Sequence, residues 1–548
     1  MFEHSGVAFL VVFESGFTVF GASNPDIPEP GDLRAAGTVD FPVSCTPAVQ
    51  AEFTRGVALL HSFFYEEARR IFTGVAAKDP TCAMAQWGIA MTWWHPIWTP
   101  PTSDEMSLGK AAVDKAMAME AGTDRERHFI TALNAYYSTP DGPATGEVGQ
   151  SCHGPVGPRD RVIAYEKAMR KLRERFPDDF ETQTFYALAV LAVGYANPTD
   201  TTLSNQLEAA RILEKLGKKN PQHPGVAHYL IHSYDYPALA ERGLAAARSY
   251  SSIAPWVPHA LHMPSHIFTR IGAWEDSVAT NVRSEDIARA ESSGDEALHA
   301  IDYQVYAYLQ MARDADAKKA VERGDDYAAR FSFFRPPGPF GQAAAPARYA
   351  LERGDWKSAA QLPVKPTKIL HAMAITHFAR AVGAARAGDS AAAQADLARL
   401  AELRDNLAAA KSAYWAGQVD IQWLGASAWT ALAEGRRDEA LKLMRSAADK
   451  ETASEKAPIS PGPILPAREL LGDMLLELGQ PALALSEYEA SQQREPNRFR
   501  GLYGAATAAA RSGDSAKAKT YFEKLAALAQ RGDSRPELQQ ARSYLAVR

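Results

Sequence analysis

Small and aromatic positions recur along the chain at a fixed interval. The clearest instance is a glycine, an alanine and an aromatic residue that return 34 positions later: Gly479, Ala484 and Tyr488, then Gly513, Ala518 and Phe522. Small residues allow neighbouring helices to pack closely, and the aromatic side chain fills the space behind them. Pro496 follows where the second helix must end. The pattern therefore predicts a series of helical hairpins.

The same spacing returns elsewhere in the chain. Further instances are Gly56, Ala68, Phe72 and Pro80; Gly388, Ala393 and Leu397; and Ala428, Gly435, Ala440 and Met444. The period and these positions resemble tetratricopeptide-repeat proteins. The resemblance implies an all-α, right-handed superhelical solenoid of about 10–12 helix hairpins, from about residue 49 to residue 546.

Three segments rich in proline and glycine are expected to interrupt the helices. They span residues 138–159, 334–346 and 455–466. The second segment is the best candidate for a boundary within the array. The expected organisation is an N-terminal segment at 1–42, a histidine-rich array at 43–334 and a second array at 347–548.

Histidines cluster in one part of the first array. The chain has 14 histidines, and six of them lie between residues 223 and 266: His223, His228, His232, His259, His262 and His266. The 228/232 pair is one helical turn apart, and the residues at 259, 262 and 266 follow at i, i+3 and i+7. Each set therefore shares a helix face.

The repeat register places this cluster on a particular surface. In tetratricopeptide proteins, positions 2, 5, 9 and 12 of each first helix line the concave groove, as the resemblance implies. Five histidines occupy such positions: His228, His232, His259, His262 and His266. Residues at matching positions in the same and neighbouring repeats are Asp235, His299, Asp302, Tyr306 and Glu181. Pro264 is expected to kink the helix in the middle of the cluster.

Imidazoles combined with a carboxylate favour Zn, Cu, Fe or Ni as a ligand set. The five histidines are the predicted metal ligands, and the other five residues form a second shell or ligand pocket. Three histidines with an open position would activate water or bind a small oxidant, so a metalloenzyme of unknown reaction is one hypothesis. The alternatives are a metal-free pocket with catalytic histidines and hydrogen bonding between helices.

Other candidates are expected to be structural. His61 is predicted to support hairpin packing, and the tryptophan-rich stretch 87–98 is predicted to fill a hairpin core. His371 and His377 are six apart and do not share a helix face, so they indicate no site. Cys152 and His153 belong either to a lid over the groove or to a simple insertion.

Charge and motifs exclude several classes of function. The formal net charge is −6, which gives no reason to expect nucleic acid. The sequence contains no Walker motif and no dinucleotide fingerprint, so no nucleotide cofactor is expected. No run reaches 18 apolar residues, so no membrane span is predicted.

The N-terminal segment and the cysteines bear on location. The first 33 residues lack Lys and Arg, and residues 7–13 are wholly apolar. The segment is either a cleaved secretion signal without a basic start or a retained β-prone arm. Of three cysteines, Cys45 and Cys82 would pair in an oxidising compartment, or all three would be unpaired buried thiols.

Residues 58–68, 82–96 and 259–268 carry a narrower resemblance. They are similar to uncharacterised bacterial tetratricopeptide proteins, many of them exported, across roughly residues 43–312. This resemblance implies a periplasmic or extracellular protein with no established activity, and the alternative is a cytoplasmic one. Two further functional hypotheses are open. One is an interaction scaffold that holds a peptide or protein in the concave groove. The other is a homo-oligomer that self-assembles end to end, as an extracellular filament.

Overall fold

Helices form almost all the regular structure of the protein. The computed structural model describes residues 36–119, 122–140, 150–151, 154–155, 159–197, 200–332 and 335–546. Within those residues the only strands are β1 (Gln150–Ser151) and β2 (Gly154–Pro155), which pair antiparallel with Gln150 opposite Pro155. Cys152 and His153 lie outside the described residues.

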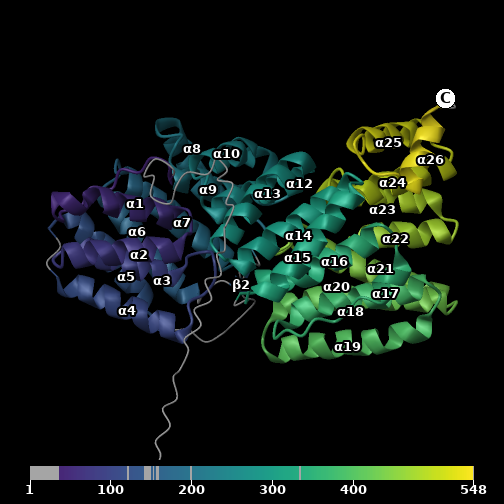
Figure 1. Cartoon of the computed structure of the whole chain (residues 1–548), viewed down its shortest axis with the longest axis horizontal. Coiled ribbons are helices and arrows are strands. Elements are labelled where there is room, and N and C mark those ends of the chain that lie inside the picture. Colours follow the sequence, from purple (N-terminus) through teal and green to yellow (C-terminus); the bar gives the residue numbers. More distant parts are fainter. Residues whose placement is uncertain are drawn as a thin grey trace, which may run out of the picture. The chain divides into compact units, whose positions relative to one another are not determined.

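Consecutive helices pack in pairs, as Figure 1 shows. After a short 3-10 turn, η2 (Pro47–Val49), the first six pairs are α1 (Gln50–His61) with α2 (Tyr65–Lys78), α3 (Ala83–Trp94) with α4 (Ser103–Ala118), α5 (Asp124–Ser138) with α6 (Arg159–Arg175), α7 (Phe180–Tyr195) with α8 (Ser204–Lys219), α9 (Pro224–Tyr234) with α10 (Ala240–Ile253), and α11 (Pro258–His262) plus α12 (Pro264–Ile271) with α13 (Trp274–Ala290).

Six more pairs follow. They are α14 (Gly294–Gln310) with α15 (Asp314–Arg330), α16 (Pro337–Glu352) with α17 (Trp356–Ala360), α18 (Leu370–Arg386) with α19 (Ser390–Ala409), α20 (Ala413–Ala433) with α21 (Arg437–Thr452), α22 (Ala467–Glu477) with α23 (Pro481–Arg494), and α24 (Phe499–Arg511) with α25 (Ser515–Leu528); α26 (Pro536–Ala546) ends the series. The predicted all-α series of helical hairpins is confirmed, and the number of pairs in the described residues falls within the expected range.

The recurring aromatic residue fills the space left by helical glycines, whereas Gly479 and Gly513 have positive φ and no atom near a Cβ position. A Cβ built on Gly472 would lie 2.7 Å from the Tyr488 ring, and one on Gly504, in the next hairpin, 2.2 Å from it. Phe72 is enclosed in the same way by Gly56, at 2.7 Å, and Gly88, at 2.6 Å. Each ring therefore fills the gap within its own hairpin, as the sequence pattern predicted, and it also joins that hairpin to the next, which was not predicted.

One predicted interruption is wrong. Residues 337–346 form the start of α16, with Pro346 inside the helix. Pro337 occupies the first turn, where its missing N–H costs nothing, and Ala343 to Ala345 favour helix. Because α16 packs against both α14 and α18, hairpins on either side of the expected boundary are in contact. The division into two arrays stays a prediction.

The other two breaks have different outcomes. Residues 455–466 are not helical, as expected. Most of the segment 138–159 that lies outside α5 and α6 falls outside the described residues. Pro264 does interrupt its helix, because α11 ends at His262 and α12 begins at Pro264.

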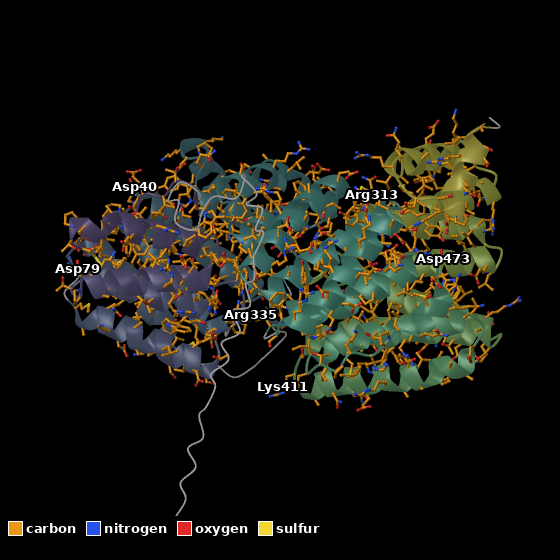
Figure 2. All side chains as sticks on the ribbon, in the orientation of Figure 1. Asp40, Asp79, Arg313, Arg335, Lys411 and Asp473 are labelled. Atoms are coloured by element: carbon orange, nitrogen blue, oxygen red, sulfur yellow. A yellow bond between two sulfur atoms is a disulfide. The ribbon has the colours of Figure 1, made fainter. Side chains whose placement is uncertain are left out.

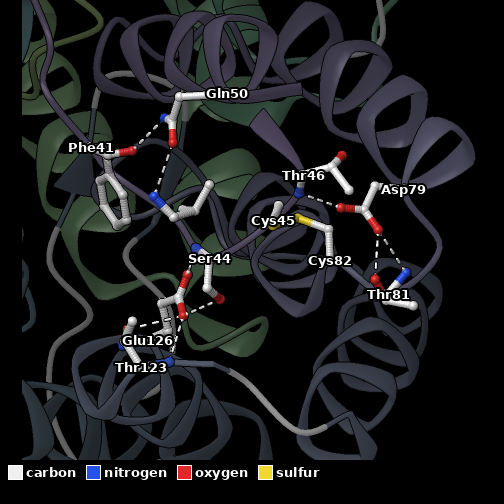
Figure 3. The surroundings of a disulfide bond; sticks show 11 residues. Phe41, Ser44, Cys45, Thr46, Gln50, Asp79, Thr81, Cys82, Thr123 and Glu126 are labelled. Carbon is white, nitrogen blue, oxygen red and sulfur yellow. Dashed lines mark hydrogen bonds between the residues drawn. A yellow bond between two sulfur atoms is a disulfide. The ribbon is translucent and has the colours of Figure 1, made fainter. Parts of the chain in front are cut away.

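A disulfide fastens the segment that precedes α1. Cys45 and Cys82 are bonded, and Figure 3 shows the polar contacts around them. The backbone N–H of Thr46 donates to Asp79 at 2.7 Å, and the Ser44 hydroxyl donates to Glu126 at 2.6 Å. Of the two alternatives left open by the sequence, the structure has the disulfide, and it holds residues 44–46 against α3 and α5.

Helices far apart in the sequence also meet. The helix α1 contacts α9, and α14 contacts α24. Arg335, labelled in Figure 2, donates to Glu66 at 2.7 Å and so joins the start of α16 to α2. Among the described residues, no helix is both long and apolar enough to cross a membrane.

Candidate metal centres

The histidines of α9, α11, α12 and α14 form two separate clusters. Site A contains His228, His232 and His259, and site B contains His262, His266 and His299. All six side chains are buried, with at most 3% exposed. The sequence pattern predicted one ligand pool made of the first five, whereas the structure divides them between two sites and adds His299 to the second.

In site A, His228 lies between the other two rings. Its Nε2 is 3.1 Å from Nε2 of His232 and 3.1 Å from Nε2 of His259. Its Nδ1 donates to the backbone carbonyl of His61 at 2.7 Å. Because a carbonyl can only accept, the neutral His228 ring carries its proton on Nδ1 and directs a lone pair into the cluster. That lone pair can accept from only one of the two neighbouring Nε2 atoms.

Aromatic side chains surround site A. The Phe63 ring centroid is 4.3 Å from that of His228, and the Trp98 centroid is 4.2 Å from that of His259. Tyr195 reaches Nδ1 of His232 with its hydroxyl at 3.3 Å. Burial in this apolar shell lowers the pKa of His228 to about 3, so the ring is neutral at physiological pH.

In site B, both outer nitrogens have fixed acceptors. Nδ1 of His262 is 2.7 Å from Oδ1 of Asn281, and Nδ1 of His266 is 2.9 Å from Oδ2 of Asp235. The inner Nε2 atoms of these two histidines are 3.1 Å apart. The His299 ring lies 4.2 Å from the His262 ring, between centroids.

The protons of site B can be counted from these contacts. Asn281 donates its amide N–H to the Ser277 carbonyl at 2.7 Å, so its oxygen faces His262. Asp235 also accepts from Arg270 at 2.9 Å, and, although burial raises its pKa, the surrounding cations hold that pKa far below its usual range. Both imidazoles therefore carry their proton on Nδ1.

Two Nε2 lone pairs consequently face each other in site B. Burial lowers the pKa of both His262 and His266, which disfavours a proton between them. A metal cation held by both atoms would resolve the repulsion. In a tetrahedral zinc site with Zn–N bonds of about 2.05 Å, two ligand nitrogens lie about 3.3 Å apart, close to the spacing seen here.

A third group of ligand-type residues has a complete set of hydrogen bonds. We call His61, Glu181 and His223 the Glu181 triad. Nε2 of His61 and of His223 lie 2.9 and 2.8 Å from the two carboxylate oxygens. The Tyr229 hydroxyl reaches Nδ1 of His61 at 2.9 Å, and the Val226 N–H donates to Nδ1 of His223 at 3.2 Å. Two neutral imidazoles satisfy every contact, so the triad needs no cation.

Of the remaining predicted site residues, one contacts a histidine site and three do not. Asp235 supports site B, as expected of an acceptor behind a ligand. Three others lie outside both sites. Asp302 pairs with Arg348 at 2.8 Å, the Tyr306 hydroxyl accepts from Arg498 at 2.8 Å, and Glu181 belongs to its triad. Their groove positions were inferred from repeat register, which does not specify which neighbour each side chain meets.

Several contributors to the sites were not predicted from the sequence. The carbonyl of His61 orients His228, although only hairpin packing was expected of that residue. Asn281 and Phe63 carried no signal, because an amide in a second helix and an aromatic residue in a turn are common without a site. Phe63 has a left-handed backbone, with φ of 54°, which is uncommon for a bulky residue and directs its ring against site A.

The expected open groove is covered at the histidines. Residues 455–466, the cover segment, lie across this face. The Tyr303 hydroxyl donates to the Pro458 carbonyl at 2.8 Å, and Arg348 donates to the carbonyls of Gly462 at 2.9 Å and Pro463 at 2.7 Å. The cover segment, which joins α21 to α22, therefore packs against the residues around site B, a contact that the repeat period cannot indicate.

A cleft of 910 Å³ lies next to both sites. Tyr195 and Asp235 line the cleft and hydrogen-bond to His232 of site A and His266 of site B, respectively. Each site therefore lies one side chain behind the cleft wall. Lys456 and Arg270 line the same wall.

No protein-family model and no curated protein matches the sequence. One similar solved structure is the crystal structure of the APC/C hetero-tetramer Cut9-Hcn1. It is 11% identical, with 92% of this chain and 90% of that chain covered, at a TM-score of 0.30. A likeness this distant carries no argument about function. The chain's own hairpins, with an aromatic ring enclosed by glycines of successive pairs, have the architecture of a tetratricopeptide-like helical repeat.

Proposed function

We propose that the protein binds transition-metal ions at sites A and B. The observation that carries the proposal is the pair of Nε2 atoms of His262 and His266, 3.1 Å apart while both Nδ1 atoms are committed as donors. All-nitrogen sites of this kind favour Zn, Cu, Fe or Ni. The carboxylate behind His266 and the amide behind His262 are the outer partners that metal-bound histidines usually have.

The chemistry of such a site follows from its ligand number. Three histidines leave a fourth position for water or a substrate atom, and a metal there supplies a Lewis acid or, with Cu or Fe, a redox centre. The histidines would hold the ion, and the adjoining cleft would admit the molecule on which it acts. A metalloenzyme is therefore the functional class we favour, with the reaction unassigned.

Titration of metal-free protein with Co²⁺ tests this proposal. Tetrahedral Co²⁺ absorbs strongly in the visible range, so each occupied site gives a spectrum. We expect His262→Ala/His266→Ala to remove the site B signal and leave site A. The matched control is His377→Ala, because His377 also contacts a carboxylate, Asp396 at 2.7 Å, but belongs to no group of three ligand-type residues among those that the structure describes. A titration of the double variant that equals the wild type rejects the ligand assignment.

An extracytoplasmic location is a second part of the proposal. The disulfide between Cys45 and Cys82 supports it, since such bonds persist mainly in oxidising compartments. Alkylation of the freshly isolated protein tests it. If both cysteines react with iodoacetamide before reduction, the protein resides where thiols are kept reduced.

A protein-interaction scaffold is the alternative function. Side chains of α14 and α16 already bind the backbone carbonyls of the cover segment, as a groove binds an extended peptide. An external peptide would therefore have to occupy the cleft. The filament hypothesis rests on residues 7–20, which lie outside the described residues, and it stays a prediction.

A further inference from the structure

A smaller pocket lies among the C-terminal hairpins, away from the two histidine sites. Its volume is 90 Å³, room for about three water molecules or one small polar group. Residues of α18, α20, α21 and the cover segment line it. Tyr414, Gln418 and Lys456 line both this pocket and the cleft, so a ligand seated in the pocket can extend into the cleft.

Aromatic rings form one wall of the pocket. The rings of His371 and Trp415 stack face to face, with centroids 3.7 Å apart and an interplanar angle of 5°. The Phe340 ring lies 6.3 Å from the first and 6.2 Å from the second. Aromatic faces carry negative potential, and they attract organic cations when water is excluded.

Two carboxyl groups that form no ion pair among the described residues line the same pocket. Within that part of the chain, neither Glu451 nor Glu495 forms an ion pair, and the Glu495 side chain makes no hydrogen bond although the residue is only 7% exposed. Glu451 accepts only the N–H of Ala467, at 2.7 Å. Burial, with a contribution from Glu495, raises the pKa of Glu451 to about 8. Burial also raises the pKa of Glu495, and it outweighs the opposite effect of four nearby cations, which are Arg270, Arg498, Lys456 and Arg494.

The cations that line the pocket are bonded to other groups. Arg494 donates to the carbonyls of Thr452 and Ser454, both at 2.9 Å. Arg468 pairs with Glu487 at 2.7 Å. Lys456 donates to the carbonyl of Ser460 at 3.1 Å. None of these three cations pairs with Glu451 or Glu495, so the carboxyl oxygens of both acids stay available to a donor from outside the chain.

Two polar atoms at the wall add to the unmet hydrogen-bonding capacity. The Gln422 side-chain oxygen and Nε2 of His371 are buried and make no hydrogen bond with any residue that the structure describes. The oxygen can only accept, and the imidazole nitrogen accepts when its proton is on Nδ1. A ligand with several N–H donors would satisfy these atoms together with the two carboxyls.

We infer that this pocket binds the ammonium or guanidinium group of a small organic cation. When the cation enters, the two carboxyls release their protons and Glu451 and Glu495 supply the negative charge. Trp415 supplies an aromatic face, and Gln422 supplies a further acceptor. The volume admits the charged head group, and the cleft receives the rest of the molecule. This inference does not depend on metal binding, so the failure of one leaves the other standing.

Calorimetric titration of the full-length protein tests the inference. The probes are n-propylammonium and methylguanidinium, with 1-propanol and N-methylurea as neutral counterparts and propionate as an anion. We expect saturable binding of both cations and binding of the other probes at least about tenfold weaker. A glycyl-lysyl-glycine arm identifies the source of the cation, because tighter binding of this tripeptide than of propylammonium assigns the head group to a peptide side chain.

Variants then locate the binding. Glu495→Gln and Glu451→Gln should each weaken cation binding about tenfold or more, whereas Glu523→Gln, an exposed glutamate on α25, should leave it unchanged. If a pocket variant does not fold, thermal unfolding of the wild-type protein still tests the inference. The two cations should raise its unfolding temperature, and the neutral and anionic probes should not. Absence of cation binding by the wild type, equal binding by the variants, or preferential binding of propionate would each overturn the inference.

Discussion

A histidine ring has two nitrogens, and one of them faces away from its cluster. At the residue scale, the hydrogen-bond partner of that outer nitrogen distinguishes a histidine that can bind a metal from one that only supports the fold. In the Glu181 triad each neutral ring donates from Nε2 to a carboxylate and accepts at Nδ1. In site B both outer nitrogens donate, so the inner ones are left with lone pairs that face each other. The triad and site B contain similar residue types, but the positions of their protons assign a structural role to the triad and a metal-binding role to site B.

Replacing the outer partner should weaken metal binding without touching a ligand. Asn281→Ala removes the acceptor that orients His262, and we expect metal affinity at site B to fall about 10- to 100-fold. A chelator competition titration measures this affinity. Site A in the same protein is the internal control, and an unchanged affinity at site B would contradict the role given to Asn281.

The triad should affect stability and not metal content. Glu181→Gln places an amide N–H against an imidazole N–H, and we expect a loss of about 1–3 kcal/mol in the free energy of unfolding. Denaturant unfolding measures it. Although burial raises the pKa of Glu181, the two imidazoles lower it to about 2 overall, so the stability gained from its charge is present above pH 4.5.

The stability gained from the Glu181 charge is lost as the pH falls from 4.5, the pKa of the unfolded state, towards 2. The difference in free energy of unfolding between wild type and Glu181→Gln should shrink over this window. Loss of metal in the variant would instead place the triad among the metal ligands.

At the scale of the element, the enclosed aromatic ring is the unit that joins hairpins. Tyr488 packs between Gly472 of α22 and Gly504 of α24, and neither position has room for a Cβ. Phe72 has the same environment between α1 and α3. The repeat signature is thus a packing requirement at a crossing of helices, and helix propensity alone would favour alanine at those glycines.

Gly504→Ala should therefore destabilise the protein despite the better helix propensity of alanine. The added methyl group would lie 2.2 Å from the Tyr488 ring, and overpacking of this kind costs about 1–3 kcal/mol. Gly417→Ala is the matched control, because a Cβ on that helical glycine meets nothing within 4 Å. We expect the control to be neutral or stabilised by up to about 1 kcal/mol in denaturant unfolding. Equal effects of the two substitutions would contradict the packing argument.

At the scale of the whole molecule, segments distant in the sequence enclose the sites. The cover segment is held over site B by Tyr303 and Arg348. The guanidinium of Arg348 also pairs with Asp302, and both side chains are fully buried. The enclosure of site B consequently depends on contacts between the middle of the array and the segment between α21 and α22.

Loosening the cover should speed metal release even though no ligand changes. Arg348→Ala leaves Asp302 without its partner and frees two carbonyls, and we expect a loss of about 3–5 kcal/mol in the free energy of unfolding. If opening of the cover is eased by about 1.4 kcal/mol, release to a chelator becomes about tenfold faster. Stopped-flow release kinetics measure this rate. A rate equal to that of the wild type would show that the segment does not control access.

The sequence predicted more at the residue and element scales than for the whole molecule. The period of glycines and aromatics predicted the hairpins, and the spacing of His228, His232, His262 and His266 predicted which rings share a helix face. The division into two sites was not predicted, because register does not tell which ring of one helix meets which ring of the next. The break at 455–466 was predicted, but the contacts of this segment and of Asn281 were not, because they join elements far apart or at positions without a pattern.

Metal analysis by mass spectrometry, on protein purified without a histidine tag, tests the central claim most directly. We expect one transition-metal ion for each of the two sites, with the site B ion lost in His262→Ala/His266→Ala. Protein that carries no such metal as isolated, and takes up none after exposure to Zn²⁺, Cu²⁺, Fe²⁺ and Ni²⁺, would contradict the claim and reduce the histidines to hydrogen-bonding residues between helices.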